Sequence, residues 1–320
     1  MTSLPLGPGA EFDRIRAIAC ALGAAAGPLG GDCAVLSEPS GSSLVLSTDV
    51  SVEEVHFRRD WLRPREIGWR SAAAALSDLA AVGADPIGLL AAVTLPRDTR
   101  EGELTELMRG VGDAVAAVGG VVLGGDLSAG AAWSVAVTVV GRASRPVSRR
   151  GARPGDGVWV TGTLGAARSA LETWRRGGEP APDARAAFAH PVARIAPGRW
   201  LAGHGATAML DLSDGLAGDA PHLAAASGVA LELDLDLLPL APSVRAAAGE
   251  LGIGPAQFAA EGGEDYELLV TLPAEFAAAD ELRAECGIPL TRIGSVGAGA
   301  VVRLRLDGVD VPLAGFDHFH

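Results

Sequence analysis

The sequence predicts a two-domain protein of the α/β or α+β class, and three observations support this prediction. The length of 320 residues corresponds to about two domains. Segments with the pattern of strands alternate with segments typical of helices in both halves of the chain. Residues 142–156 form a polar stretch rich in Pro and Gly, as a domain junction would. We therefore expect domains at 1–145 and 146–320, in a strand order that the pattern alone does not give.

In the first half of the chain, composition and the spacing of apolar residues predict the helices, and short apolar runs predict the strands. Residues 66–83 are rich in Ala, contain no Pro and end at Gly83, as a helix would. Residues 100–119 place apolar side chains at helical spacing. In chain order we expect helix 11–26, strand 43–50, helix 66–83, strand 88–96, helix 100–119, and strands 120–126 and 133–141.

The same alternation of patterns resumes after the junction. In chain order we expect strand 157–161, helix 163–175, helix 191–203, strand 207–211, helix 215–226, strand 229–235, strand 266–272, helix 274–286, and late strands near 291–306.

The composition is that of a globular protein, with 48% hydrophobic residues and a mean hydropathy of +0.27. No apolar run reaches about 18 residues, so no membrane span is expected. The apolar stretch 17–31 follows acidic residues, which argues against a signal peptide. Cys20, Cys33 and Cys286 form no CxxC pair, which favours a reduced, cytoplasmic protein without a zinc site.

The charge balance excludes several classes of protein. The formal net charge of −13 argues against binding to nucleic acid, which requires a basic face. Phosphates remain possible ligands if divalent cations lie between them and carboxylates. The chain contains no Lys, so a Walker A loop is excluded.

Acidic residues recur at the ends of the predicted elements, often next to Gly. They are Asp32, Asp49, Asp78, Asp126, Asp211, Asp214, Glu264 and Asp265. Apart from Asp78, each of these residues, taken alone, is more readily explained as a turn residue or helix N-cap. Asp78 differs because it lies within an Ala-rich helix that predicts burial, and a buried carboxylate must be paired or bound to a metal. A bridge to Arg70, two turns earlier, is the structural alternative to a Mg²⁺ site.

Residues 46–57, LSTDVSVEEVHF, begin as a strand that is expected to end on three oxygen-bearing side chains. Ser47, Thr48 and Asp49 are either turn residues or part of the metal-binding edge. His56 has no Cys or His partner at metal-binding spacing, so it is interpreted as a substrate contact or a surface residue.

Seven motifs follow one another between about residues 11 and 319: STD…HF, LSDLAAVGADP, GGD, TGTLG, LDLSDGL, GGEDYELL and GFDHF. With this ordered set the sequence resembles the thiamine-monophosphate kinase family, of the superfamily that includes aminoimidazole ribonucleotide synthetase and selenophosphate synthetase. The resemblance implies a two-domain fold like that of aminoimidazole ribonucleotide synthetase, with an N-terminal sheet completed across a homodimer and a C-terminal α/β domain. It also implies ATP-dependent phosphorylation of thiamine monophosphate to thiamine diphosphate, with several Mg²⁺ ions.

The resemblance also implies roles for individual residues. The implied magnesium ligands are Asp32, Ser47, Thr48, Asp49, Asp78, Asp126, Asp211 and Asp214, with Ser47 and Asp214 weaker or additional. The implied ATP contacts are Gly125, Asp126, Arg149 and Ser213. The implied substrate contacts are His56, Glu264 and Phe316. A solvated linker arginine is an equally good interpretation of Arg149, and simple packing of the tail is the alternative for Phe316.

The chain departs from the family pattern at several positions. Gly31 stands where the family usually has Asp, Ala75 where it has Asn, Ala166 and Ala167 where it often has Asp-Ser, Arg70 where Lys is common, and Phe316 where an aromatic with a hydroxyl is frequent. The alternatives are therefore another ATP-dependent enzyme of the superfamily, or a non-catalytic nucleotide-binding homologue.

The expected chemistry is phosphoryl transfer to an acceptor that is already anionic. A phosphate oxygen needs no general base, so catalysis is expected to consist of positioning and charge neutralisation. We expect direct in-line transfer without a covalent intermediate, with Asp49, Asp78 and Asp126 acting through bound Mg²⁺.

Overall fold

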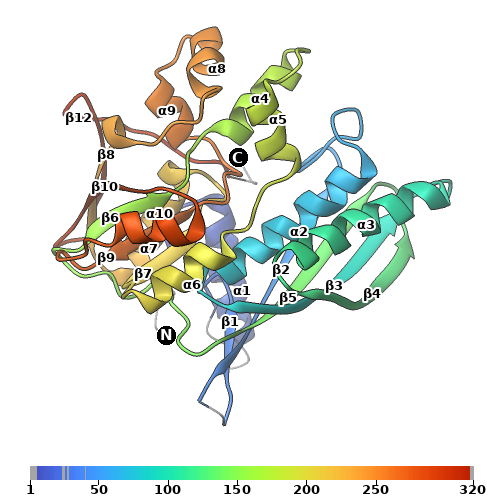
Figure 1. Cartoon of the computed structure of the whole chain (residues 1–320), viewed down its shortest axis with the longest axis horizontal. Coiled ribbons are helices and arrows are strands. Elements are labelled where there is room, and N and C mark those ends of the chain that lie inside the picture. The colour runs from blue at the N-terminus through green and yellow to red at the C-terminus, as the bar shows by residue number, and fades with distance from the viewer. Residues whose placement is uncertain (1–5, 24–25, 27–28, 40, 318–320) are drawn as a thin grey trace.

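A computed structural model of the chain describes residues 6–23, 26, 29–39 and 41–317. In these residues two mixed sheets occupy opposite ends of the molecule, and helix α2 (Pro64–Ala81) contacts strands of both (Figure 1). The predicted α/β or α+β architecture is confirmed. No helix in the described ranges is both long enough and apolar enough to cross a membrane.

The first sheet has the strand order β1-β2-β5-β3-β4 within the described residues. Its strands are β1 (Ala34–Ser37), β2 (Ser43–Val52), β3 (Asp85–Leu95), β4 (Val121–Ala129) and β5 (Ser134–Ala143). Only β3 and β4 pair in parallel. Helices α2 and α3 (Glu101–Ala117) cover one face of this sheet (Figure 1). Alternate residues of β5 are buried, as expected of a strand with one covered face.

Two glycines allow α2 and α3 to pack with their backbones in contact. A Cβ atom at Gly68 would lie 1.9 Å from the carbonyl oxygen of Leu107, and one at Gly110 would lie 1.9 Å from that of Arg65. Any larger side chain at either position would push the helices apart. Because α2 also supplies two side chains of the site described below, this close packing fixes part of the site.

The second sheet has the order β12-β11-β8-β10-β6-β9-β7 within the described residues. Its strands are β6 (Gly157–Thr161), β7 (Ala208–Asp211), β8 (Ala230–Asp234), β9 (Leu268–Leu272), β10 (Leu290–Gly297), β11 (Val302–Leu306) and β12 (Val309–Asp310). Only β8 and β11 pair in parallel.

The remaining helical elements are mostly short. They are α1 (Ala10–Leu22), α4 (Ala166–Arg175), α5 (Pro182–Ala189), α6 (Ile195–Gly203), α7 (Leu216–Ser227), the 3₁₀ turn η2 (Leu235–Leu237), α8 (Val244–Leu251), α9 (Pro255–Ala260) and α10 (Ala279–Cys286). All the predicted elements are present, whereas α5, α8, α9, η2, β1 and β12 were not predicted. Helix α10 begins five residues later than predicted, since residues 274–278 are a turn and irregular chain.

The two sheets share part of one hydrophobic core. Val137 of β5, Leu76 of α2 and Val270 of β9 belong to the same cluster of buried side chains. A second cluster lies within the second half of the chain and includes Leu210 of β7 and Leu231 of β8. The division at residues 145 and 146 stays a prediction.

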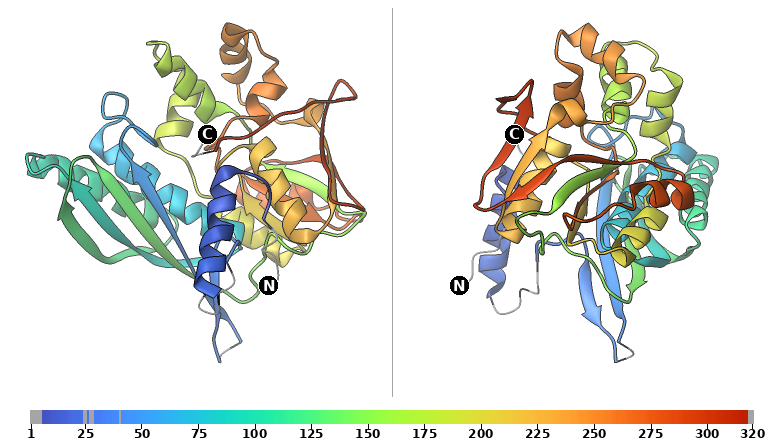
Figure 2. Two further views of the ribbon diagram at one scale, coloured as in Figure 1. Left: turned by 180° about the vertical axis from the view of Figure 1, so that it is seen from behind. Right: turned by 60° about the vertical axis from the view of Figure 1, so that its left-hand side comes forward.

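Helix α1 lies across the junction of the two halves of the molecule (Figure 2, left). Its first amide, Ala10 N, donates a hydrogen bond to Asp317 Oδ2 at 2.7 Å. The ring of Phe12 stacks on His222 of α7, with 3.7 Å between the ring centroids. The first helix is therefore fastened to both the C-terminal tail and α7.

Strand β4 forms one edge of the first sheet, and all of its residues are exposed. Several of them are large and apolar, including Val121, Leu123 and Leu127, the last with 60% of its surface exposed. An unpaired apolar edge strand of this kind is a surface on which another strand can pair.

Candidate active site

A cavity of about 1140 Å³ lies between the two halves of the molecule. Its walls come from β2, α2, the turn after β7, the loop before β9, helix α1 and the C-terminal tail. Most of the residues predicted from the sequence line it: Asp32, Thr48, Asp49, His56, Asp78, Arg149, Asp211, Ser213, Asp214, Glu264 and Phe316. The fold thus brings together side chains that are far apart in the sequence.

One end of the cavity holds a cluster of three carboxylates. Asp32 lies just before β1, Asp78 lies near the end of α2, and Asp211 is the last residue of β7. Each offers an oxygen within 4.8 Å of the oxygens of the other two. Asp78 was expected to be buried and is half-buried. The predicted alternative of an Arg70–Asp78 bridge is wrong, because Arg70 pairs with Glu264.

The carboxylates of this cluster disfavour one another's charge. Burial raises the pKa of Asp211 to about 7, and the neighbouring Asp32 adds to the shift. Burial also raises the pKa of Asp78 well above its ordinary value, and the charges of Asp49 and Asp211 raise it further. The buried Oδ2 atom of Asp32 accepts no hydrogen bond within the described residues. Such a set of crowded oxygens fits a hard divalent cation such as Mg²⁺.

The predicted end of the strand at residues 47–49 is wrong, because β2 continues to Val52. Ser47 and Asp49 lie on the face of β2 that meets α2, and Ser47 Oγ donates to Asp78 Oδ2 at 2.5 Å. Thr48 lies on the opposite face, with its Oγ1 atom 3.0 Å from Thr138 Oγ1. The strand therefore continues past its polar residues and divides them between its two faces.

Arg149 is not the solvated linker arginine that the sequence left open. Its guanidinium donates from Nη2 at 2.6 Å and from Nε at 3.0 Å to Asp32 Oδ1, and 19% of its side chain is exposed. A charge-assisted pair of this kind fixes the guanidinium at the edge of the carboxylate cluster.

The turn after β7 carries the predicted residues Ser213 and Asp214. Gly215 has a φ of 93°, which favours glycine, and it precedes α7. Asp219, in the first turn of α7, accepts a hydrogen bond from Asp214 N at 3.1 Å. Burial raises the pKa of Asp219, and the charge of Asp214 adds to the shift. Asp219 was not predicted as a site residue, although an Asp in the first turn of a helix was a visible signal.

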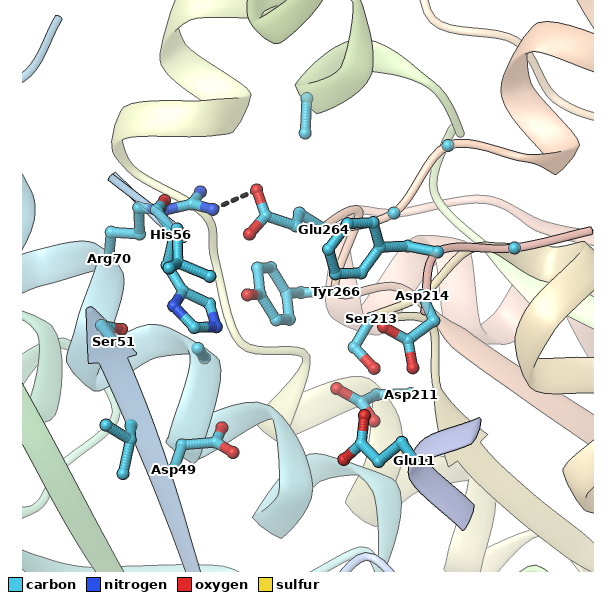
Figure 3. Close-up of a pocket in the computed structure, with 18 of the residues that line it drawn as sticks. Glu11, Asp49, Ser51, His56, Arg70, Asp211, Ser213, Asp214, Glu264 and Tyr266 are labelled. Atoms are coloured by element: carbon cyan, nitrogen blue, oxygen red, sulfur yellow. Dashed lines mark hydrogen bonds and ion pairs between the residues drawn. The ribbon is translucent and has the colours of Figure 1, made fainter. Parts of the chain in front are cut away.

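The other end of the cavity contains His56, Arg70, Glu264 and Tyr266 (Figure 3). Val52 N donates to Nδ1 of His56 at 3.1 Å, so the neutral ring carries its proton on Nε2 and is a donor. The Arg70 guanidinium forms an ion pair with Glu264 across this end (Figure 3).

The loop that carries Glu264 has an unusual backbone. Glu264 and Tyr266 have φ angles of 68° and 50°, a region that residues other than glycine rarely adopt. Glu264 N donates to Ser213 O at 2.7 Å, and Tyr266 N donates to Leu212 O at 2.9 Å. Bonds to the turn after β7 thus hold the loop in this conformation, which is common at functional sites.

Phe316 reaches the cavity because the tail is held against α7. Phe316 N donates to Asp214 O at 2.9 Å, and a Cβ atom at Gly315 would lie 2.5 Å from the same oxygen. The ring of Phe316 is about half exposed, so it is not simply buried in packing. His318 and Phe319, the last residues of the GFDHF motif, lie outside the described residues.

Comparison with known proteins identifies the family. Family models of AIR synthase related proteins match residues 30–143 as the N-terminal domain and 153–307 as the C-terminal domain. The chain is 37% identical over 296 residues to the thiamine-monophosphate kinase of Methanospirillum hungatei JF-1, covering 90% of this chain and 92% of the relative. It is 35% identical over 293 residues to that of Aquifex aeolicus, again covering 90% and 92%. The chain belongs to the thiamine-monophosphate kinase family.

Solved structures of thiamine-monophosphate kinases share the fold. AaThiL complexed with AMPPCP and TMP matches with a TM-score of 0.87 at 35% identity, covering 97% of each chain. The enzyme from Aquifex aeolicus matches with a TM-score of 0.82 at 33% identity, covering 94% of this chain and 98% of that chain. The hydrogenase maturation protein HypE, 21% identical with a TM-score of 0.74, shows a common fold alone. The resemblance seen in the ordered motifs is therefore confirmed.

In this member of the thiamine-monophosphate kinase family, Gly125 and Asp126 lie apart from the other predicted site residues. Both are on β4, outside the lining of the cavity. In the sheet, Asp49 of β2 and Gly125 of β4 are separated by β5 and β3. Three strand spacings of about 4.8 Å separate them, or roughly 14 Å. A single chain therefore does not bring Asp126 to the carboxylate cluster.

Proposed function

We propose that this protein transfers the γ-phosphoryl group of ATP to thiamine monophosphate, forming thiamine diphosphate and ADP. One observation carries the proposal: in a chain of the thiamine-monophosphate kinase family, a single cavity has a carboxylate cluster at one end and His56, Glu264 and Phe316 near the other. A similar solved structure contains AMPPCP, an ATP analogue, together with TMP.

Magnesium is the metal that the residues of the cluster fit. The donors are carboxylate and hydroxyl oxygens, and the charge of Asp211 beside Asp78 favours a cation between them. Asp32 Oδ2 has no hydrogen-bond partner among the residues that the structure describes. We propose that Asp32, Asp78 and Asp211 hold Mg²⁺ with help from Ser47, Asp49 and Asp214. Of the other predicted ligands, Thr48 has its side chain on the opposite face of β2, and Asp126 would have to come from a second copy of the chain. Bound Mg²⁺ supplies charge neutralisation for the phosphates of the nucleotide.

The nucleotide is proposed to lie next to the cluster, where Arg149 and Ser213 line the cavity. The guanidinium of Arg149 is fixed by Asp32, so it presents its charge to an incoming phosphate without having to be ordered first. Ser213 offers a hydroxyl from the turn after β7. These side chains would orient the donor.

The acceptor is proposed to lie at the end formed by His56, Glu264 and Phe316. The attacking phosphate oxygen is anionic near neutral pH, so no side chain has to remove a proton from it. His56 can donate from Nε2 to the acceptor phosphate, since Nδ1 already accepts from Val52 N. The cationic thiazolium ring is attracted by the Glu264 carboxylate and by the face of the half-exposed Phe316 ring.

We also propose that two copies of the chain form a homodimer through the first sheet, and that this interface completes the site. Support comes from the apolar, exposed β4 edge and from the position of Asp126 on that edge. Mg²⁺ binds oxygens at about 2.1 Å, so Asp126 and Asp49 of one chain are too far apart to bind the same ion. A second copy would have to supply Asp126 if it is a ligand of that ion.

The compartment proposed for this reaction is the cytoplasm. Cys20, Cys33 and Cys286 are all free thiols, and Cys33 is buried. Free thiols are typical of reducing compartments.

Product analysis tests the proposed reaction. Purified protein is incubated with Mg-ATP and thiamine monophosphate, and the products are separated by chromatography. We expect thiamine diphosphate and ADP in equal amounts, none without Mg²⁺ and none from unphosphorylated thiamine. Bound ATP without any product would contradict the proposal and favour a non-catalytic homologue.

Mixing two inactive variants tests the shared site. Asp78→Asn and Asp126→Asn are each expected to be inactive alone. If the partner subunit's Asp126 completes the site, random exchange of subunits restores about one quarter of wild-type activity, because half of the dimers then hold one intact site. A mixture that stays inactive, although light scattering shows mixed dimers, would place Asp126 within its own subunit's site, and an active Asp126→Asn variant would place it outside the site.

A further inference from the structure

Arg70 is a buried cation that joins three segments around the acceptor end of the cavity. Only 2% of its surface is exposed. Its Nε donates to His56 O at 3.2 Å, its Nη1 donates to Phe188 O at 2.8 Å, and its Nη2 pairs with Glu264 Oε2. The guanidinium also lies over the ring of Phe188, 3.8 Å from the centroid. Each of the three nitrogens of this planar group therefore contacts a different segment.

These three segments come from both halves of the molecule. His56 follows β2, Phe188 lies in α5, and Glu264 lies in the loop before β9. Arg70 itself is in α2, whose position is fixed by its close packing on α3. A rigid helix thus carries a side chain that touches the two residues proposed to contact the acceptor, one from each side of the cavity (Figure 3).

Glu264 depends on this contact for the direction of its side chain. Its backbone is fixed in the left-handed region by the hydrogen bond to Ser213 O. Its side chain is 25% exposed to the cavity, and the ion pair with Arg70 holds one of its two carboxylate oxygens. Without Arg70 the carboxylate would be free to rotate toward solvent or toward the carboxylate cluster.

We propose that Arg70 is a positioning residue for the acceptor: it sets the distance between His56 and Glu264 and thereby the affinity for thiamine monophosphate. This inference rests on the proposed function, since it assumes that both residues contact the acceptor. Arg70 acts through these residues and does not itself touch the transferred group. Lys at this position would keep the charge but lose the planar fork that serves three acceptors at once.

A second arginine of the same kind provides a matched control. Arg185 of α5 donates to both carboxylate oxygens of Glu66 in α2, at 2.8 and 3.1 Å, and neither residue lines the cavity. Substituting Arg185 therefore removes an ion pair between the same two helices that Arg70 joins, but leaves the acceptor end intact. A purely structural role for Arg70 predicts that neither substitution changes the KM for thiamine monophosphate.

The test compares Arg70→Gln and Arg70→Lys with Arg185→Gln and Arg185→Lys. We expect Arg70→Gln to raise the KM for thiamine monophosphate by about tenfold or more, as the loss of a charge-assisted hydrogen bond does. The KM for ATP should change by less than about twofold, and kcat should fall less than KM rises. Arg70→Lys should lie between wild type and Arg70→Gln. Both Arg185 variants should lower the melting temperature and leave both KM values unchanged.

Each outcome decides between the possibilities. If Arg70→Gln lowers the melting temperature but leaves the KM for thiamine monophosphate at the wild-type value, the inference is overturned and Arg70 is structural. If Arg70→Gln does not fold, the KM for thiamine monophosphate of Arg70→Lys is compared with that of Arg185→Lys instead, and an unchanged KM overturns the inference. A wild-type protein that forms no thiamine diphosphate would overturn the proposed function first, and the inference with it.

Discussion

The carboxylates at the two ends of the cavity have different surroundings. At the acceptor end, Glu264 is paired with Arg70. At the other end, Asp32, Asp78 and Asp211 crowd together, and the pKa values of Asp78 and Asp211 are raised by burial and by their neighbours' charges. In the proposed function, the Glu264–Arg70 pair lies where the acceptor would bind, and the crowded carboxylates lie where a cation would bind, with Arg149 as the chain's own counter-charge for Asp32. A carboxylate thus has a counter-charge from the chain at one end, whereas burial and neighbouring charges disfavour the ionised forms of Asp78 and Asp211 at the other.

The largest expected effect comes from removing a carboxylate of the cluster. Asp78→Asn should lower kcat by about a thousandfold or more, because the loss of a metal ligand removes charge stabilisation that acts in the transition state. Steady-state production of thiamine diphosphate measures this. Near-normal turnover would remove Asp78 from the metal site.

The same variant should be no less stable than wild type without metal. Asn keeps an oxygen that can accept from Ser47 Oγ and removes one of the charges that repel one another. Thermal unfolding in EDTA checks this. Clear destabilisation would show that the cluster is held together by the chain itself, and the contrast between the two ends would be lost.

At the acceptor end the expected effect on stability has the opposite sign. Glu264→Gln should destabilise the protein by about 3 kcal/mol, because it leaves the buried Arg70 guanidinium without its counter-charge. Chemical denaturation compares the variant with Glu261→Gln, whose Arg168 partner is more exposed. An equal, small effect in both variants would mean that the Arg70 pair contributes no more than a surface pair.

Added Mg²⁺ should stabilise the wild-type protein. At a hundredfold excess over its dissociation constant the gain is about 2.7 kcal/mol, or about 5 °C in melting temperature for a protein of this size. Asp78→Asn should show little of this shift, and Glu264→Gln should show all of it. A shift of equal size in both variants would place the bound cation away from the cluster.

The smallest expected effect concerns His56. His56→Ala should raise the KM for thiamine monophosphate by about tenfold, the loss of one hydrogen bond to a charged group, and lower kcat by less. Steady-state kinetics with thiamine monophosphate varied at saturating ATP measures both constants. A kcat lowered by orders of magnitude with an unchanged KM would make His56 a catalytic group.

Much of the fold was predictable because its long elements have strong patterns. Helix α2 was predicted within two residues at each end from its Ala content and the glycine that follows it. The short helices α8 and α9 were missed because Gly252, Gly254 and Pro255 interrupt the region in which they lie. Strand β1 was missed because it has only four residues, all exposed, and its partner β2 defines it.

The sequence indicated many of the residues that line the cavity, but it did not indicate which side chains contact one another. Most of the site residues predicted from the ordered motifs line the cavity. The pairing of Arg70 with Glu264 could not be predicted, because the partners are nearly 200 residues apart and Asp78 was a nearer candidate partner for Arg70. The continuation of β2 past Asp49 was missed because Ser, Thr and Asp usually mark a turn, whereas here they are accommodated on a paired strand.

The hydrogen bond between helix α1 and the tail bears on how the chain folds during its synthesis on the ribosome. Ala10 and Asp317 are 307 residues apart, so α1 emerges long before the residue that accepts its first amide hydrogen. Chains fold from the N-terminal side as they are made. The contact of α1 with the tail can therefore form only near the end of synthesis, later than the stacking of Phe12 on His222 of α7.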